Sequence, residues 1–165
     1  MYFNNETILY LDGKFVKATE STTDLYGQTL HYGYGAFEGI RSYETEHGTK
    51  VFKAEEHYER LKKSCELVKI PFDYKMQELV EATYELLEKN NLKNAYIRPL
   101  VYCAPNMSLT KPTSVSLMIA VWDWGAYLGE KLLRLTVSSY CRPHPKSIHI
   151  EAKICGHYVN SILAT

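Results

Sequence analysis

Arginine is scarce in this chain of 165 residues, and three of its arginines lie in segments whose composition suits a binding site. The sequence contains 14 lysines but only 5 arginines, among them Arg41, Arg60 and Arg98. The planar guanidinium of arginine binds a carboxylate or a phosphate through two parallel hydrogen bonds, which the point charge of lysine cannot reproduce. These arginines are therefore candidate ligands for an anionic group. A structural role is the alternative: Arg98 could pair with a surface acid, and Arg60 with Glu56 one helical turn before it.

Residues 26–39 (YGQTLHYGYGAFEG) combine four glycines with several aromatic residues. This density of glycine interrupts any long helix or strand and lets the backbone approach a neighbouring group closely. The block is not a dinucleotide-binding fingerprint, because it follows no clear parallel strand and opens no long amphipathic helix. Taken alone, it is a glycine-rich bend with buried rings.

The elements that must position these residues are strands on either side of two helices. Residues 7–16 predict a hairpin that turns at Asp12-Gly13, a dipeptide suited to positive φ. Further strands are expected at 40–43 and 50–52, joined through residues 46–48, and at 95–104, 115–122 and 133–138. Helical spacing of apolar residues predicts helices over 54–69 and from Asp73, as the N-cap, to Asn90-Asn91. This order predicts an α+β fold of two layers, an antiparallel sheet covered by two helices.

The last part of the chain is expected to leave this small domain, which spans residues 1–138. Residues 139–149 contain Pro143 and Pro145, a composition typical of an interdomain linker. Residues 150–165 place Tyr158, Ile162 and Leu163 at helical spacing but carry no helix stop signal. We expect residues 150–165 to be the truncated start of a second domain, and the chain to be the first part of a longer protein.

Composition argues against several classes of function. The 19 basic and 19 acidic residues give a formal net charge of zero, which argues against a nucleic-acid partner. No apolar run approaches the roughly 18 residues of a membrane span, and the N-terminus lacks the pattern of a signal peptide. We therefore expect a cytoplasmic protein. The four cysteines form no C-x-x-C pair and no zinc-ligand spacing, which predicts reduced thiols and no metal site.

Seven blocks of the sequence, taken together and in order, resemble the branched-chain amino acid aminotransferases of class IV of the pyridoxal-phosphate enzymes. The blocks are LDGKFV, LHYGYGAFEGIRSYET, EHYERL, NAYIRPL, WDWGAYLG, VSSYCRP and EAKICGHYVNS. The resemblance implies the small domain of a fold-type IV enzyme. It also implies transfer of the amino group of L-leucine, L-isoleucine or L-valine to 2-oxoglutarate. Family subunits are about twice this long, and the other half supplies the acid that pairs with the pyridine nitrogen, so we expect this chain to be inactive alone.

The resemblance also assigns the residues that bind the cofactor, pyridoxal 5′-phosphate. Lys153 matches the lysine that forms the Schiff base and moves the proton during transfer. Arg60 matches the arginine that holds the cofactor phosphate, and Tyr158 matches the tyrosine that bonds the ring oxygen. Cys155 and His157 depart from the family pattern. We expect His157 to be a polar spacer, because Lys153 already supplies the base.

For the substrate pocket, the resemblance implies a wall of aromatic and small residues. Phe37 and Gly39 match part of this wall, and Trp124 is expected to line the same cavity. Tyr127 lies near it, and Tyr32 reaches it from a dimer partner in this family. The resemblance therefore implies a homodimer or a higher homo-oligomer.

Two further residues match groups that bind the carboxylates of amino acids and 2-oxo acids. Tyr96 matches a tyrosine close to the substrate α-carboxylate, and Arg98 matches the arginine that accepts the distal carboxylate of glutamate. An arginine surrounded by rings lets one pocket accept both an apolar and an anionic side chain. Arg41 is expected to be structural.

Two alternatives to this function remain open from the sequence. The first is another class IV enzyme, a D-amino acid transaminase or an aminodeoxychorismate lyase. The FEGIRSYET, YIRP and GAYLG blocks favour the branched-chain enzyme over both. The second is a non-catalytic fragment that dimerises or binds a partner chain through its aromatic loop.

Overall fold

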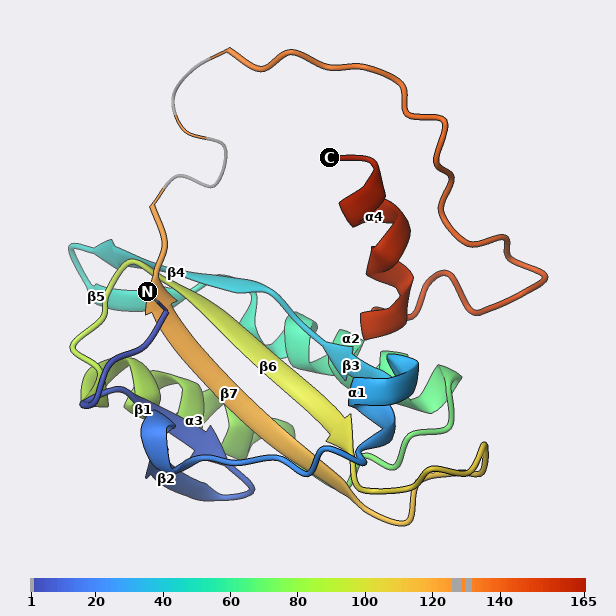
Figure 1. Cartoon of the computed structure of the whole chain (residues 1–165). Helices are drawn as coiled ribbons and strands as arrows, with labels where there is room; N and C mark the ends of the chain where they lie inside the picture. Colours follow the sequence, from blue (N-terminus) through green and yellow to red (C-terminus); the bar gives the residue numbers. More distant parts are fainter. Residues whose placement is uncertain (1, 126–128, 130–131) are drawn as a thin grey trace.

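An antiparallel sheet forms the centre of the computed structural model, which describes residues 2–125, 129 and 132–165 (Figure 1). The strands are β1 (Ile8–Leu11), β2 (Lys14–Lys17), β3 (Gly35–Phe37), β4 (Ile40–Thr45), β5 (Gly48–Val51), β6 (Ala95–Cys103) and β7 (Val115–Asp123). Their order is β2-β1-β7-β6-β4-β5, and β3 also pairs with β6. Every pair of described strands is antiparallel. The prediction of an α+β fold with an antiparallel sheet is confirmed.

Two helices, α2 (Ala54–Leu67) and α3 (Met76–Lys89), cover one face of this sheet (Figure 1). Tyr58, Leu61 and Cys65 of α2 are fully buried, as are Leu79 and Leu86 of α3 to within one percent. Each fully buried leucine stabilises the fold by about 1.5–3 kcal/mol. The two helices predicted from apolar spacing are therefore present, and they pack against one face of the sheet.

The predicted start of α3 is wrong, whereas its predicted end is confirmed. The N-cap of α3 is Lys75, which makes no side-chain capping bond. Asp73 lies in the irregular stretch after Pro71, so the helix begins too late for Asp73 to cap it. At the other end, Asn91 adopts a positive φ of 52°. The Asn90 side chain bonds both the N–H and the C=O of Ile8, at 2.9 and 3.0 Å, and so ties α3 to β1.

The hairpin between β1 and β2 forms at the predicted dipeptide. Asp12 and Gly13 have φ values of 46° and 85°, the left-handed conformations that a tight two-residue turn requires. The second predicted hairpin, β4 to β5, turns at Gly48 with φ of 88°. Two short helices complete the first half of the chain, η1 (Ala18–Glu20) and α1 (Gln28–Tyr32).

Strand β6 separates the core from the site. Along β6, alternate residues are buried and half-buried. Ile97 and Val101 point to the helices and are fully buried. Tyr96 and Arg98 therefore point to the opposite face, since neighbouring side chains of a strand alternate. Both β3 and β4 pair with the same edge of β6, and the pairing breaks at residues 38–39, opposite Pro99, which has no N–H to donate.

The segment after residue 150 returns to this edge and packs along β3. The N–H of Phe37 donates to the Lys153 carbonyl at 3.1 Å, and the N–H of Gly156 donates to the Gly33 carbonyl at 3.1 Å. A Cβ atom on Gly33 would lie 2.7 Å from Gly156 Cα, so only glycine fits there. The glycine-rich block was predicted to permit a close backbone approach, and the chain it approaches is the one that carries Lys153. Two short helices follow, η2 (Cys155–Tyr158) and α4 (Val159–Leu163).

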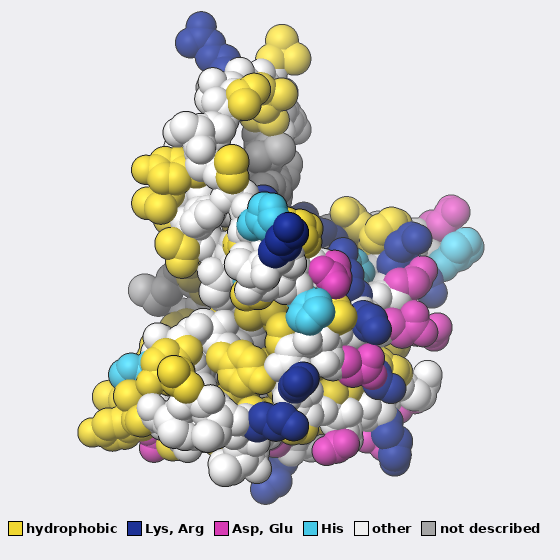
Figure 2. All heavy atoms as spheres, turned by 90° about the vertical axis from the view of Figure 1, so that its right-hand side faces the viewer, with side chains coloured by type: hydrophobic (Ala, Val, Ile, Leu, Met, Phe, Trp, Pro, Cys, Tyr) yellow, Lys and Arg dark blue, Asp and Glu magenta, His cyan; other side chains and the backbone are white. Residues whose placement is uncertain are grey.

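The strand predicted at residues 133–138 is absent, and this prediction is wrong. These residues pair with no strand of the described chain, and the exposed fractions of Leu135 and Val137 are 90% and 96%. Their composition favours a strand, but a strand forms only beside a partner that accepts its backbone hydrogen bonds. In Figure 1 this part of the chain arches away from the sheet before it returns at α4, and Figure 2 shows apolar side chains gathered on the projecting part.

The described residues include no helix long and apolar enough to cross a bilayer. The division of the chain at residues 138 and 149 stays a prediction.

Candidate active site

Lys153 is held at the edge of the sheet by its own backbone. Its N–H donates to the hydroxyl of Ser64, a buried residue of α2, at 3.0 Å, and its carbonyl accepts from Phe37. Its Nζ donates to the Tyr158 hydroxyl at 2.6 Å. Nζ also lies 4.6 Å from the centre of the Phe37 ring. The amine is thus placed between two rings and bonded to a phenol.

A cavity of about 750 Å³ opens beside this amine. Its walls contain six of the residues predicted for the site, namely Lys153, Tyr158, Phe37, Tyr96, Arg98 and Trp124. Four lining residues were not predicted as ligands, namely Arg41, Leu100, Cys155 and Ile162. Leu100 could have been found from the alternation of β6, since it lies two residues after Arg98. Arg41 also donates from Nη1 to the Gly125 carbonyl at 3.2 Å.

Arg98 lies in the wall of the cavity among aromatic rings. Its Nη2 donates to the Tyr96 hydroxyl at 2.9 Å, and its Cζ lies 4.6 Å from the centre of the Phe37 ring. Its Nε is buried and has no hydrogen-bond partner in the described part of the chain. A buried donor without an acceptor is costly, so this guanidinium suits an anionic ligand.

Gly39 serves the site by leaving room rather than by lining the cavity. A Cβ at this position would lie 2.1 Å from the Tyr96 hydroxyl oxygen. The Tyr96 ring in turn packs against Trp124, with centroids 5.0 Å apart. Gly39 therefore leaves the space that the Tyr96 hydroxyl occupies, and this hydroxyl accepts from Arg98.

Arg60 pairs with Glu38, and the alternative partner Glu56 is wrong. Arg60 Nε donates to Glu38 Oε1 at 2.6 Å, and Nη2 donates to Oε2 at 2.7 Å. His57 Nδ1 lies 2.9 Å from the same Oε2. Burial opposes the charge of Glu38, but the bonds from Arg60 and His57 hold the pKa of Glu38 below its usual value. Glu56 instead lies 3.7 Å from Lys53.

Tyr32 lies on α1, away from the cavity of its own chain. Its hydroxyl donates to the Met107 carbonyl at 2.9 Å, and 44% of the residue is exposed. Leu30 and Leu109 nearby are exposed by 62% and 88%. The expected role of Tyr32 in the pocket of another copy stays a prediction. Tyr127 falls outside the described residues.

Burial shifts the pKa values of Cys65, Cys103 and His157 in the direction that favours their neutral forms. Burial raises the pKa of Cys65 to about 12 and that of Cys103 to about 11, so both are neutral thiols at pH 7. All four cysteines are unpaired. His157 is buried, and burial together with the charge of Arg142 lowers its pKa. The described residues include no group of three or more acidic, histidine or cysteine side chains that could hold a metal.

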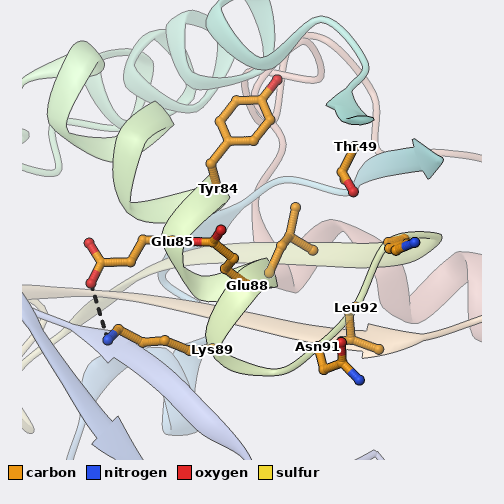
Figure 3. A pocket seen from close by; sticks show the side chains of 9 residues that line it. Thr49, Tyr84, Glu85, Glu88, Lys89, Asn91 and Leu92 are labelled. Carbon is orange, nitrogen blue, oxygen red and sulfur yellow. Dashed lines mark ion pairs between the residues drawn. The ribbon is translucent and has the colours of Figure 1, made fainter. Parts of the chain in front are cut away.

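A second hollow, of about 910 Å³, lies at the end of α3 (Figure 3). Two of its charged side chains form an ion pair, with Lys89 Nζ 3.2 Å from Glu85 Oε1. The Tyr84 hydroxyl accepts from the Val51 N–H at 3.1 Å. None of the residues predicted for the site lines this hollow, so its size alone does not make it a functional cavity.

A lysine amine bonded to a tyrosine hydroxyl, beside an apolar cavity with an arginine in its wall, has groups that suit amino-group chemistry on small carboxylates. Comparison with known proteins gives the family. The amino-transferase class IV profile matches residues 35–165. The chain therefore belongs to the class IV aminotransferases, a family that depends on pyridoxal phosphate.

The similar proteins that follow are all described as branched-chain aminotransferases. The enzyme of Pseudomonas aeruginosa is 38% identical over 98% of this chain and 54% of its own length. The crystal structure from Thermoproteus uzoniensis with norvaline matches with a TM-score of 0.91 and 35% identity, over 96% of this chain and 54% of that one. The crystal structure of the Escherichia coli enzyme gives a TM-score of 0.90 and 36% identity, over the same shares. The chain spans about half the length of the curated relatives it matches.

Proposed function

We propose that this chain carries the amine, the phosphate-binding arginine and the substrate wall of a branched-chain amino acid aminotransferase. The proposed reaction moves the amino group of L-leucine, L-isoleucine or L-valine to 2-oxoglutarate. The observation that carries the proposal is the Lys153 amine, bonded to Tyr158 at 2.6 Å beside a cavity that also contains Arg98. The names of the relatives support the choice of substrate class.

The donor set suits pyridoxal 5′-phosphate. Lys153 offers a primary amine. The Arg60 side chain is 54% exposed, although it makes two hydrogen bonds to Glu38. When bound, the cofactor supplies an aldehyde that condenses with an amine and a ring that withdraws electrons from the substrate α-carbon. Arg60 would hold the phosphate, and the Tyr158 hydroxyl would bond the ring oxygen.

Lys153 is the proposed base. The Lys153 amine would take the proton from the substrate α-carbon and hold it at Nζ for its return during transfer. The backbone bonds to Ser64 and Phe37 fix the segment that carries this amine. The bond from Nζ to Tyr158 fixes the amine itself. These contacts supply the positioning on which proton transfer depends.

Arg98 and the surrounding rings are proposed to admit both kinds of substrate. Phe37, Leu100 and Trp124 offer an apolar wall to a branched side chain. Arg98 rests against the Phe37 ring, which stabilises the guanidinium when no anion is bound. When glutamate or 2-oxoglutarate binds, Arg98 would accept its distal carboxylate, with Tyr96 near the α-carboxylate.

We further propose a homodimer or a higher homo-oligomer in the cytoplasm, in which Tyr32 of one copy completes the pocket of another. Its exposed position on α1 supports this arrangement. Gel filtration with light scattering tests the assembly.

Donor choice tests the function. In the full-length protein loaded with the cofactor, we expect L-leucine to convert the cofactor to its amine form, and D-alanine to leave it unchanged. The change is read from the absorbance spectrum. Conversion by D-alanine alone supports a D-amino acid transaminase, and turnover of aminodeoxychorismate supports a lyase. Failure to take up the cofactor supports a non-catalytic fragment.

A further inference from the structure

Glu38 is a carboxylate with no exposed surface, placed between two residues that build the substrate pocket. Its relative exposure is 0%, and it follows Phe37 and precedes Gly39. Its N–H donates to the Pro99 carbonyl at 2.9 Å, which fixes the backbone at the break between β3 and β4. Burying a charged carboxylate is expensive unless it is paired and hydrogen-bonded. The charge therefore needs an explanation.

The Glu38 carboxylate is fully satisfied by groups on α2 and by its own neighbour. Arg60 donates to both oxygens, at 2.6 and 2.7 Å. His57 Nδ1 lies 2.9 Å from Oε2, and the Gly39 N–H donates to the same oxygen at 3.2 Å. Two parallel bonds between a carboxylate and a guanidinium fix the plane of the guanidinium as well as its distance.

The pair is strongly asymmetric in exposure. Glu38 is completely enclosed, whereas 54% of the Arg60 side chain faces solvent. Of the five N–H donors of arginine, the two bonds to Glu38 occupy two, and Nη2 also lies 3.4 Å from His57 Nδ1, so at least two are left for another acceptor. Here the carboxylate is buried and the guanidinium is presented outward.

Helix α2 links this guanidinium to the reactive amine. Arg60 and Ser64 are one turn apart on α2 and share a face, and the Ser64 hydroxyl accepts the N–H of Lys153. The bond to Glu38 raises the pKa of Arg60, and the nearby Tyr158 adds to the same shift. The helix thus sets the spacing between the Arg60 guanidinium and the backbone of Lys153.

We propose that Glu38 is a positioning residue that holds Arg60 in the orientation needed to bind the phosphate ester of the cofactor, with His57 bracing the carboxylate. This inference rests on the proposed function, because that function gives Arg60 its phosphate. It adds a residue that touches neither cofactor nor substrate. The alternative is that Glu38 only stabilises the fold.

The two roles differ in their dependence on the phosphate. Dissociation constants of pyridoxal 5′-phosphate and of pyridoxal, which lacks the phosphate, are measured by absorbance for the wild-type chain and for Glu38→Gln. We expect Glu38→Gln to raise the dissociation constant of pyridoxal 5′-phosphate about tenfold and to leave that of pyridoxal unchanged. Without the Glu38 carboxylate, the Arg60 side chain is no longer held in one orientation before the phosphate binds. The matched control is Glu56→Gln, which removes the same charge from an exposed residue of α2. This control is expected to leave both constants unchanged.

Folding is followed in parallel by thermal unfolding. If Glu38→Gln does not fold, Glu38→Asp tests the same expectation, since it keeps the charge but is too short to maintain the fork. In an Arg60→Gln background, Glu38→Gln is expected to cause no further loss of phosphate-dependent affinity. The positioning role is overturned if Glu38→Gln leaves the ratio of the two dissociation constants unchanged, including when it weakens binding of both ligands equally. It is also overturned if the wild-type chain shows no preference for pyridoxal 5′-phosphate over pyridoxal.

The fate of the proposed function is read separately, by borohydride reduction and peptide mapping. Phosphate-dependent binding that needs Glu38 without labelling of Lys153 supports the role of Glu38 and contradicts the proposed function. Labelling of Lys153, with phosphate-dependent binding that does not need Glu38, supports the proposed function and contradicts the role of Glu38.

Discussion

Gly39→Ala is expected to destabilise the fold through one defined collision. The added Cβ would lie 2.1 Å from the Tyr96 hydroxyl oxygen and 2.9 Å from Tyr96 Cζ. The ring cannot withdraw freely, because it packs against Trp122 and Trp124 with centroids 4.9 and 5.0 Å away. Forcing extra volume into such a contact costs about 1–3 kcal/mol. Displacing the hydroxyl also removes the acceptor of Arg98 Nη2, a bond to a charged group worth about 1.5–3 kcal/mol.

The free energy of unfolding in urea measures this effect directly. Gly125→Ala is the matched control, because a Cβ at Gly125 meets nothing within 4 Å, and it is expected to change stability little. Tyr96→Phe removes the atom nearest to the new methyl group, so the loss in the Gly39→Ala/Tyr96→Phe double variant is expected to be smaller than the sum of the two single losses. Additive losses, or a Gly39→Ala variant as stable as Gly125→Ala, refute the proposed contact between these two residues.

Three further outcomes follow from the same geometry. In the full-length protein, Tyr96→Phe is expected to lower kcat/KM for glutamate about tenfold relative to leucine, because Arg98 Nη2 loses its acceptor; equal losses for both donors contradict this. Since the bonds from Arg60 and His57 lower the pKa of Glu38, its contribution to stability is present above pH 4.5 and is lost as the pH falls further. Glu38→Gln is therefore expected to flatten the fall in the urea midpoint between pH 6 and pH 3, and an unchanged slope argues against it. Leu61→Ala, in the centre of the core, is expected to reduce the free energy of unfolding by about 2–5 kcal/mol, and a smaller loss contradicts the packing of α2.

The sequence predicted those elements of the fold whose formation depends on neighbouring residues, such as tight turns and amphipathic helices. The hairpin at Asp12-Gly13 forms because that dipeptide tolerates positive φ, and α2 forms because its apolar residues recur at helical spacing. The prediction of a strand at residues 133–138 was wrong because β-propensity cannot supply a partner strand. The prediction that Asp73 caps α3 was wrong because a residue suited to capping does not by itself decide where a helix begins.

The site was predicted in its residue types but not in its contacts. The motif blocks identified Lys153 and Arg98, and the structure places both on one cavity. Glu38 was missed because its partner Arg60 lies 22 residues later, and no local rule connects a strand end to the face of a helix. An acidic residue between Phe37 and Gly39, in an otherwise uncharged block, was the available signal. The contact between Gly39 and Tyr96 was missed for a similar reason, since their closeness arises from strand pairing.

The central claim is that Lys153 is the amine that receives pyridoxal 5′-phosphate. Its most direct test is to add the cofactor to this chain, reduce with borohydride, and locate the label by mass spectrometry of the peptides. We predict that Lys153 carries most of the label, because its Nζ is held between Tyr158 and Phe37 beside the cavity. A label spread evenly over Lys153 and the other 13 lysines, or no label at all, would contradict the claim.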